Sequence, residues 1–249
     1  HPALSAAARA ERTVPLFVLD ERLLGSRFAA PNRVAFLREA LADLDSSLRV
    51  AGGRLVLRRG DPVREAIAAA RECGATELHA SADYSAYARE CERRLARACE
   101  EERIELRLHP GTTIVPPGAV TPTGGDHFKV FTPYHRAWSE LALRRRVGPP
   151  RELAVPTRLR SERLPALEAL LAMGAGTGAA GGAISPRRAK GGEAEGRRLA
   201  RAFLRDRLGH YEEHHDDLAG DETSRLSAHL RFGCVSPLAL MREADEREG

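Results

Sequence analysis

The first half of the chain alternates short apolar runs with longer amphipathic segments. Val14–Asp20 is an apolar run that ends in an acid, which is typical of a buried parallel strand. Pro31–Val50 places its apolar side chains near helical spacing, and Gly52-Gly53 follows as a stop. Leu55–Leu57 is therefore predicted to be the next strand.

The same alternation continues as far as residue 108. Asp61-Pro62 predicts a helix start, with the acid as cap and the proline in the first turn, and the helix should run to about Cys73. A strand at Glu77–Ala80, a charged helix at Tyr84–Glu102 and a strand at Ile104–Leu108 follow. Strands separated by helices predict an α/β fold with a parallel, Rossmann-like sheet and helices on both faces.

The chain opens on a helix-like segment, Ala3–Arg12, and has no strand before it. A doubly wound domain normally opens with a central strand, so we expect that such a strand precedes His1-Pro2 in a longer protein. In that case the sheet has an open edge or groove where the strand belongs.

Beyond Pro110 the pattern changes. Phe128–Trp138 is an aromatic cluster, and a helix ending at Arg144-Arg145-Arg146 is predicted after it. Residues from Gly174 to Gly192 are rich in glycine, alanine and basic side chains, which favours a flexible linker. A basic helix is predicted from Glu193 to about Leu208.

Composition excludes several protein classes. With 43% apolar and 30% charged residues the chain can bury a core, and its net charge of +4 gives only a mild preference for polyanions. The four cysteines form no CxxC pair, so we expect reduced thiols in a cytoplasmic protein and no zinc ribbon. No apolar run approaches the ~20 residues needed to cross a membrane.

The most distinctive chemistry lies between Tyr211 and Pro237. Thr223-Ser224-Arg225-Leu226-Ser227 places three hydroxyls within five residues, ahead of an apolar helical stretch. Hydroxyls and free backbone N–H groups at a helix start can bind a phosphate. On local chemistry alone a simple capped helix is favoured, with Thr223 or Ser224 as the cap, because such capping is common.

The string TSRLSAHLRFGCVSP, with a tyrosine twelve residues before its threonine, resembles the FAD-binding signature of the DNA photolyase/cryptochrome family. The resemblance implies that Tyr211, Thr223, Ser224, Arg225, Leu226 and Ser227 contact the phosphate and ribose portions of FAD. Four other blocks agree in order and spacing: His1–Leu4, Arg33–Pro62, Phe128–Trp138 and Gly191–Ala194.

This resemblance implies a domain plan and an activity. Residues 1–125 would form the antenna α/β domain, 126–192 a connector and linker, and 193–249 the beginning of an all-α FAD-binding domain. The implied activity is deoxyribodipyrimidine photolyase, a carbon–carbon lyase. In it, reduced FAD repairs cyclobutane pyrimidine dimers in DNA by light-driven electron transfer. The alternative is a cryptochrome-type blue-light sensor without repair.

The resemblance also sets expectations for partners and limits. It implies DNA containing pyrimidine dimers as partner, a monomer, and a second antenna chromophore of unresolved identity. Folate in its usual pose is disfavoured, because Arg107–Pro110 holds no acid. No catalytic residue is expected in this chain. We expect it to be inactive alone and to retain FAD poorly, since the rest of the helical domain would complete the pocket.

Some positions depart from the family pattern or compete with it. His215 and Leu238 replace basic residues near the expected DNA face. Gly176–Gly181 matches GxGxxG but lacks a preceding strand, so a linker is favoured. His210, His214 and Asp217 share a helical face, although ordinary solvated residues are favoured over a metal site.

A basic run could follow a DNA backbone or could be a solvated helix face. Its members are Arg187, Arg188, Lys190, Arg197, Arg198, Arg201, Arg205 and Arg207. An adenine-nucleotide module of the electron-transfer-flavoprotein kind ranks last, because no phosphate loop is evident in the first half.

Overall fold

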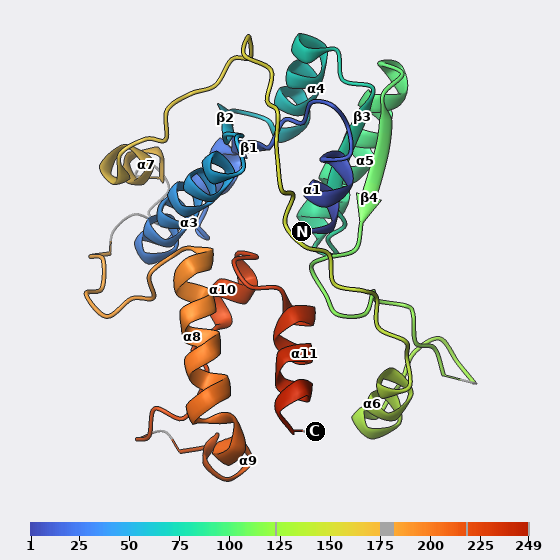
Figure 1. Ribbon diagram of the computed structural model, residues 1–249, viewed down its shortest axis with the longest axis vertical. Coiled ribbons are helices and arrows are strands. Elements are labelled where there is room, and N and C mark those ends of the chain that lie inside the picture. Colours follow the sequence, from blue (N-terminus) through green and yellow to red (C-terminus); the bar gives the residue numbers. More distant parts are fainter. Residues whose placement is uncertain (123, 175–181, 218, 249) are drawn as a thin grey trace.

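The computed structural model describes residues 1–122, 124–174, 182–217 and 219–248 (Figure 1). An α/β unit occupies one end of the molecule, and a group of helices formed by the C-terminal part of the chain lies at the other. The GxGxxG match at 176–181 falls outside the described residues. Within the described ranges, no helix is long and apolar enough to span a membrane.

The strands form two parallel ladders. β1 (Leu16–Leu19) pairs with β2 (Val56–Arg59), and β3 (Glu77–Ser81) pairs with β4 (Glu105–His109). The predicted α/β class and the parallel pairing are confirmed. The single sheet is replaced by two ladders, since no strand pairing joins β1 to β3 among the described residues.

The helices of this unit begin and end where local chemistry places them. They are α1 (Pro2–Ala7), α2 (Glu21–Leu24), α3 (Pro31–Val50), α4 (Pro62–Cys73) and α5 (Ala86–Glu101). The Asp61 side chain accepts hydrogen bonds from Val63 N at 3.1 Å and Arg64 N at 3.0 Å, as its predicted capping role requires. Gly74, at φ 64°, closes α4 in the left-handed region.

Helices cover both faces of the β3–β4 ladder. Leu78 and Leu106 pack with Cys99 of α5 in an apolar cluster. Ser81, on the opposite face of β3, lies against α1, where its Oγ is 3.4 Å from Nε2 of His1. This alternation of faces along a strand is the reason that apolar and polar residues alternate there.

A second apolar cluster lies beneath α3. Leu19, Leu41 and Leu57 are buried in it, together with Leu170 of α7 (Leu167–Gly174), which is fully buried. The connector therefore returns to the α/β unit and supplies part of its core.

The predicted helix ending at Arg144–Arg146 is wrong. The aromatic cluster itself is helical, as α6 (Phe131–Ser139), and the chain is not helical from Glu140 to Arg146. Arg242 Nη2 donates to the carbonyls of Leu143 at 3.4 Å and of Arg144 at 3.0 Å. These tertiary hydrogen bonds take the place of the bonds that a helix would have made.

The C-terminal part of the chain is helical, as expected. α8 (Glu193–Asp206) is followed by a 3-10 turn (Leu208–His210), α9 (Tyr211–His214), α10 (Ser227–Arg231) and α11 (Pro237–Glu248). α10 and α11 lie beside α8, whose N-terminal end meets α3 of the α/β unit (Figure 1). α8 begins at the predicted residue and ends two residues before Leu208.

Candidate functional site

The signature segment is anchored on α8 through one leucine. Leu226 is fully buried and packs with Ala200 of α8 and with Val235. Its neighbours Thr223, Arg225 and Ser227 are exposed, and Ser224 is half-buried. The buried leucine therefore holds a row of hydroxyl and guanidinium groups at the surface, where a ligand can reach them.

The backbone at Arg225 has an unusual conformation. Arg225 lies at φ 50° in the left-handed region, and Leu226 returns to φ −86°, ψ −1°. Such a change of hand turns successive backbone N–H groups toward one concave side, which favours anions. Arg225 Nε also pairs with Oδ1 of Asp221 at 2.5 Å, and the Arg225 side chain remains 67% exposed.

Neither Thr223 nor Ser224 caps a helix. α10 begins at Ser227, and its N-cap residue Leu226 has no side-chain acceptor. Ser224 Oγ accepts a hydrogen bond from Leu226 N at 3.4 Å, which is a local turn within the segment. The capped-helix interpretation is therefore wrong for these hydroxyls. The idea of a phosphate at a helix start is weakened too, because α10 has only five residues.

Tyr211 lies apart from the other signature residues, beyond the C-terminal end of α8 (Figure 1). Its ring meets the edge of Phe203 at a centroid distance of 5.5 Å, and the side chain is 41% exposed. Arg207 links this end to the segment, since its Nη1 donates to the Thr223 carbonyl at 3.4 Å. The structure thus brings Thr223–Ser227 together beside α8 and places Tyr211 past the C-terminal end of that helix.

His229 is a buried residue that the sequence interpretation did not single out. It has no exposed surface, and its ring meets Phe36 of α3 in an edge contact at 5.0 Å. Burial lowers the pKa of His229. The Lys190 backbone lies close to the ring, but neither ring nitrogen has a partner in hydrogen-bond geometry among the described residues.

Comparison with known proteins places the chain in a family. Residues 1–156 match the family profile described as DNA photolyase. The chain belongs to this family. It is 43% identical over 252 residues to the deoxyribodipyrimidine photo-lyase of Streptomyces griseus, an alignment that covers all of this chain and 53% of that protein.

Solved structures of photolyases share the fold. A bacterial class III photolyase from Agrobacterium tumefaciens matches with a TM-score of 0.80 and 25% identity, over 97% of this chain and 49% of its own. An archaeal photolyase from Sulfolobus tokodaii, solved with two FAD molecules, matches at 0.74 and 22%, over 100% and 53%. The chain therefore spans about half the length of the photolyases that it matches.

His215 and Leu238, the two residues that depart from the photolyase pattern, lie in different structural environments. His215 Nδ1 lies 3.1 Å from the Tyr211 carbonyl and 3.0 Å from the Glu212 carbonyl, so the ring closes the end of α9. Leu238 of α11 is 1% exposed and belongs to the buried core. Its replacement of a basic residue is therefore explained by packing.

No metal centre is evident at the histidines. The rings of His210 and His214 meet edge to face at 6.4 Å. Among the described residues, no group of three or more histidine, cysteine, aspartate or glutamate side chains is arranged to hold a metal ion.

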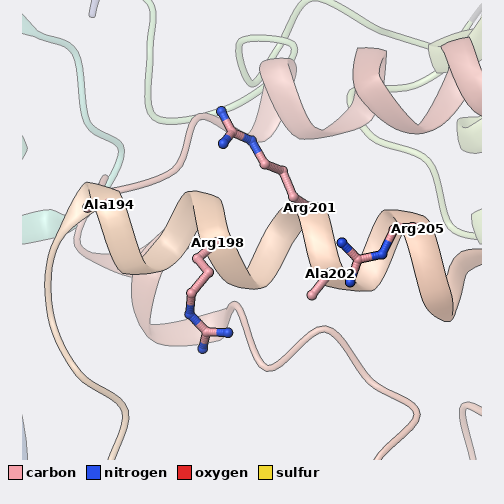
Figure 2. Close-up of a pocket in the computed structure, with 5 residues that line it drawn as sticks. All are labelled: Ala194, Arg198, Arg201, Ala202 and Arg205. Atoms are coloured by element: carbon pink, nitrogen blue, oxygen red, sulfur yellow. The ribbon is translucent and has the colours of Figure 1, made fainter.

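The basic run does not form a continuous cationic track. Along α8, Arg197 pairs with Glu193, Arg198 with Glu195 and Arg205 with Asp206. Figure 2 shows that Arg201 projects away from Arg198, on the other side of the helix. Most of these charges are balanced by neighbouring acids, which favours a solvated helix face over a DNA track.

The carboxyl ends of the strands are tied together by α5. The Tyr87 hydroxyl donates to Asp20, which follows β1, and Arg94 contacts both carboxylate oxygens of Asp61 at 2.8 and 2.7 Å. Burial and then the Asp20 carboxylate raise the pKa of Tyr87. The Thr112 hydroxyl donates to the Ala82 carbonyl at 2.9 Å, so the loop after β4 is fixed beside the end of β3. Ligands of parallel sheets bind at this edge.

Proposed function

We propose that the complete protein carrying this chain is a deoxyribodipyrimidine photolyase, which repairs cyclobutane pyrimidine dimers in DNA with light. One observation carries the proposal. A chain of the photolyase family presents Thr223, Arg225 and Ser227 on an exposed ledge, held by the buried Leu226.

FAD is the cofactor that these residues would hold. Thr223, Ser224 and Ser227 offer hydroxyls, Arg225 offers a guanidinium beside a turned backbone, and Leu226 fixes the ledge on α8. These groups suit a diphosphate and a ribose, and Tyr211 would bind further along the elongated cofactor. Bound FAD would supply the light absorption and the electron transfer. This chain contributes binding and orientation, and we assign it no catalytic residue.

The domain plan follows the same proposal. Residues 1–125 would form the antenna domain, 126–192 the connector and linker, and 193–249 the start of the FAD domain. A second chromophore would bind at the carboxyl ends of the strands. FAD is one candidate, because the Sulfolobus photolyase was solved with two FAD molecules. The dimer would be flipped out of the duplex, since FAD cannot reach a stacked base.

An absorption spectrum of the purified complete protein tests the cofactor assignment. Flavin bands in stoichiometric amount, lost or weakened in Arg225→Ala, are the expected result. A flavin-free protein would refute it. Flavin without light-dependent repair would instead support the cryptochrome-type sensor. We further propose a cytoplasmic monomer, which size-exclusion chromatography of the complete protein tests in part.

A further inference from the structure

We propose that Glu39 and Asp43, one turn apart on α3 of the α/β unit, are positioning residues for the FAD site. They act by holding the N-terminal end of α8, and the inference rests on the proposed function. Neither residue belongs to the signature, and both lie far from it along the chain.

Asp43 caps α8 from another part of the molecule. Its Oδ2 accepts hydrogen bonds from Glu193 N at 2.7 Å and from Ala194 N at 3.3 Å. The local N-cap residue, Gly192, has no side chain to do this. Asp43 therefore satisfies backbone donors at the start of α8 and places a carboxylate at the positive end of the helix dipole.

Glu39 fixes the segment that leads into α8. Its Oε2 accepts from Gly191 N at 2.8 Å and from Arg188 Nη1 at 2.8 Å. The hydrogen bond from Arg188 lowers the pKa of Glu39, against the opposing effect of burial. Asn32 adds a third contact, since its Oδ1 accepts from Ser185 N at 2.9 Å. The described part of the predicted flexible linker is thus anchored on α3.

The approach of α8 to α3 is close enough to require glycine. A Cβ at Gly191 would lie 2.1 Å from the Phe36 carbonyl oxygen, and one at Gly192 would lie 3.1 Å from Asp43 Cβ. Gly192 also has φ 118°, which other residues rarely adopt. Glycine at positions 191 and 192 therefore permits the close packing that places the start of α8 against α3.

α8 in turn contacts three parts of the signature. Phe203 meets Tyr211, and Ala200 packs on Leu226. Arg207, directly after the helix, donates to the Thr223 carbonyl. A change in how α8 packs on α3 would therefore move the signature residues that contact α8 and Arg207, namely Tyr211, Leu226 and Thr223.

The test compares Asp43→Ala with Asp45→Asn in the complete, flavin-loaded protein. Asp45 also lies on α3, but its carboxylate binds Leu55 N at 2.8 Å and Arg49 at 2.8 Å, within the α/β unit. Loss of a helix cap changes equilibria by roughly twofold to thirtyfold. We expect Asp43→Ala to speed FAD dissociation within that range, well below its unfolding temperature. Asp43→Asn, which keeps one oxygen acceptor, should recover part of the loss.

Asp45→Asn should lower the unfolding temperature without changing the rate of FAD dissociation. Equal dissociation rates in Asp43→Ala and the wild type would overturn the inference, and so would equal acceleration by Asp45→Asn. Amide hydrogen exchange of the complete protein gives a second readout, which does not depend on bound cofactor. Asp43→Ala should deprotect residues 193–206 selectively, and unchanged exchange there would overturn the inference. If the wild type holds no flavin, the proposed function fails. Hydrogen exchange would still test whether Asp43 holds the N-terminal end of α8.

Discussion

Gly196 sits where α8 packs against α10, and its replacement by alanine tests that packing. A Cβ there would lie 2.7 Å from Val235 Cγ2 and 2.8 Å from His229 Cδ2. Both distances are far below ordinary carbon contacts of ~3.5 to 4.0 Å. His229 is fully buried and Val235 is 8% exposed, so neither side chain can swing into solvent.

The sign of the effect follows from two opposing magnitudes. Alanine in place of glycine inside a helix gains about 1 kcal/mol. Overpacking a well-filled core costs roughly 1–3 kcal/mol. We expect Gly196→Ala to be destabilising by about 1 kcal/mol in urea unfolding followed by far-UV circular dichroism.

The same substitution in a Val235→Ala variant separates the helix-propensity gain from the cost of overpacking. In Val235→Ala one of the two close contacts is removed while the contact with His229 remains, so Gly196→Ala should cost less there than in the wild type. The close packing of α8 on α10 would be refuted if Gly196→Ala stabilised the wild-type chain by the full propensity gain.

Three further perturbations test other contacts. Arg58 is 1% exposed, and its Nη2 and Nη1 lie 2.6 Å from Glu72 Oε2 and 3.6 Å from Glu65 Oε2. Glu72→Gln should therefore lower the free energy of unfolding in urea by about 1–2 kcal/mol, less than for a fully buried pair because Glu72 is 37% exposed. Glu102→Gln, at the exposed pair with Arg71, should cost less, and an equal loss would contradict the burial argument. The hydrogen bond from Arg188 holds the pKa of Glu39 below its usual 4.5. The ionised Glu39 therefore stabilises the fold above pH 4.5, and this stabilisation is lost as the pH falls below that value. Glu39→Gln should flatten the acid limb of the stability profile, and an unchanged limb would contradict the assignment. Burial raises the pKa of the Cys99 thiol, so a thiol reagent should modify Cys99 only after unfolding, whereas rapid labelling of the native protein would contradict its position.

The α/β unit could be predicted from the sequence because its signals are local. Asp61-Pro62 predicts the start of α4 by capping chemistry, and the apolar spacing of Pro31–Val50 with the stop at Gly52-Gly53 predicts α3. What spacing does not contain is pairing between strands. The periodicity within a segment does not record which strands pair in space. Among the described residues, the lack of pairing between β1–β2 and β3–β4 is consistent with the open edge or groove expected in the sheet.

The site was predicted unevenly for the same reason. The signature positions were recognisable as a string, yet the capping role of Thr223 and Ser224 was wrong, because the buried Leu226 and the turn at Arg225 decide where α10 begins. Asp43 and Glu39 could not be identified at all. Their partners lie about 150 residues away along the chain. The segment expected to be helical up to Arg144–Arg146 instead offers two carbonyls to Arg242, another contact between distant residues.

Light-dependent repair by the complete protein tests the central claim most directly. An oligonucleotide carrying one cyclobutane pyrimidine dimer is incubated with the protein under blue light, with a dark sample as control. The account predicts that the dimer is restored to two pyrimidines only in the light, and that Arg225→Ala reduces repair together with bound flavin. A flavin-loaded protein that binds the oligonucleotide and leaves the dimer intact in the light would contradict it.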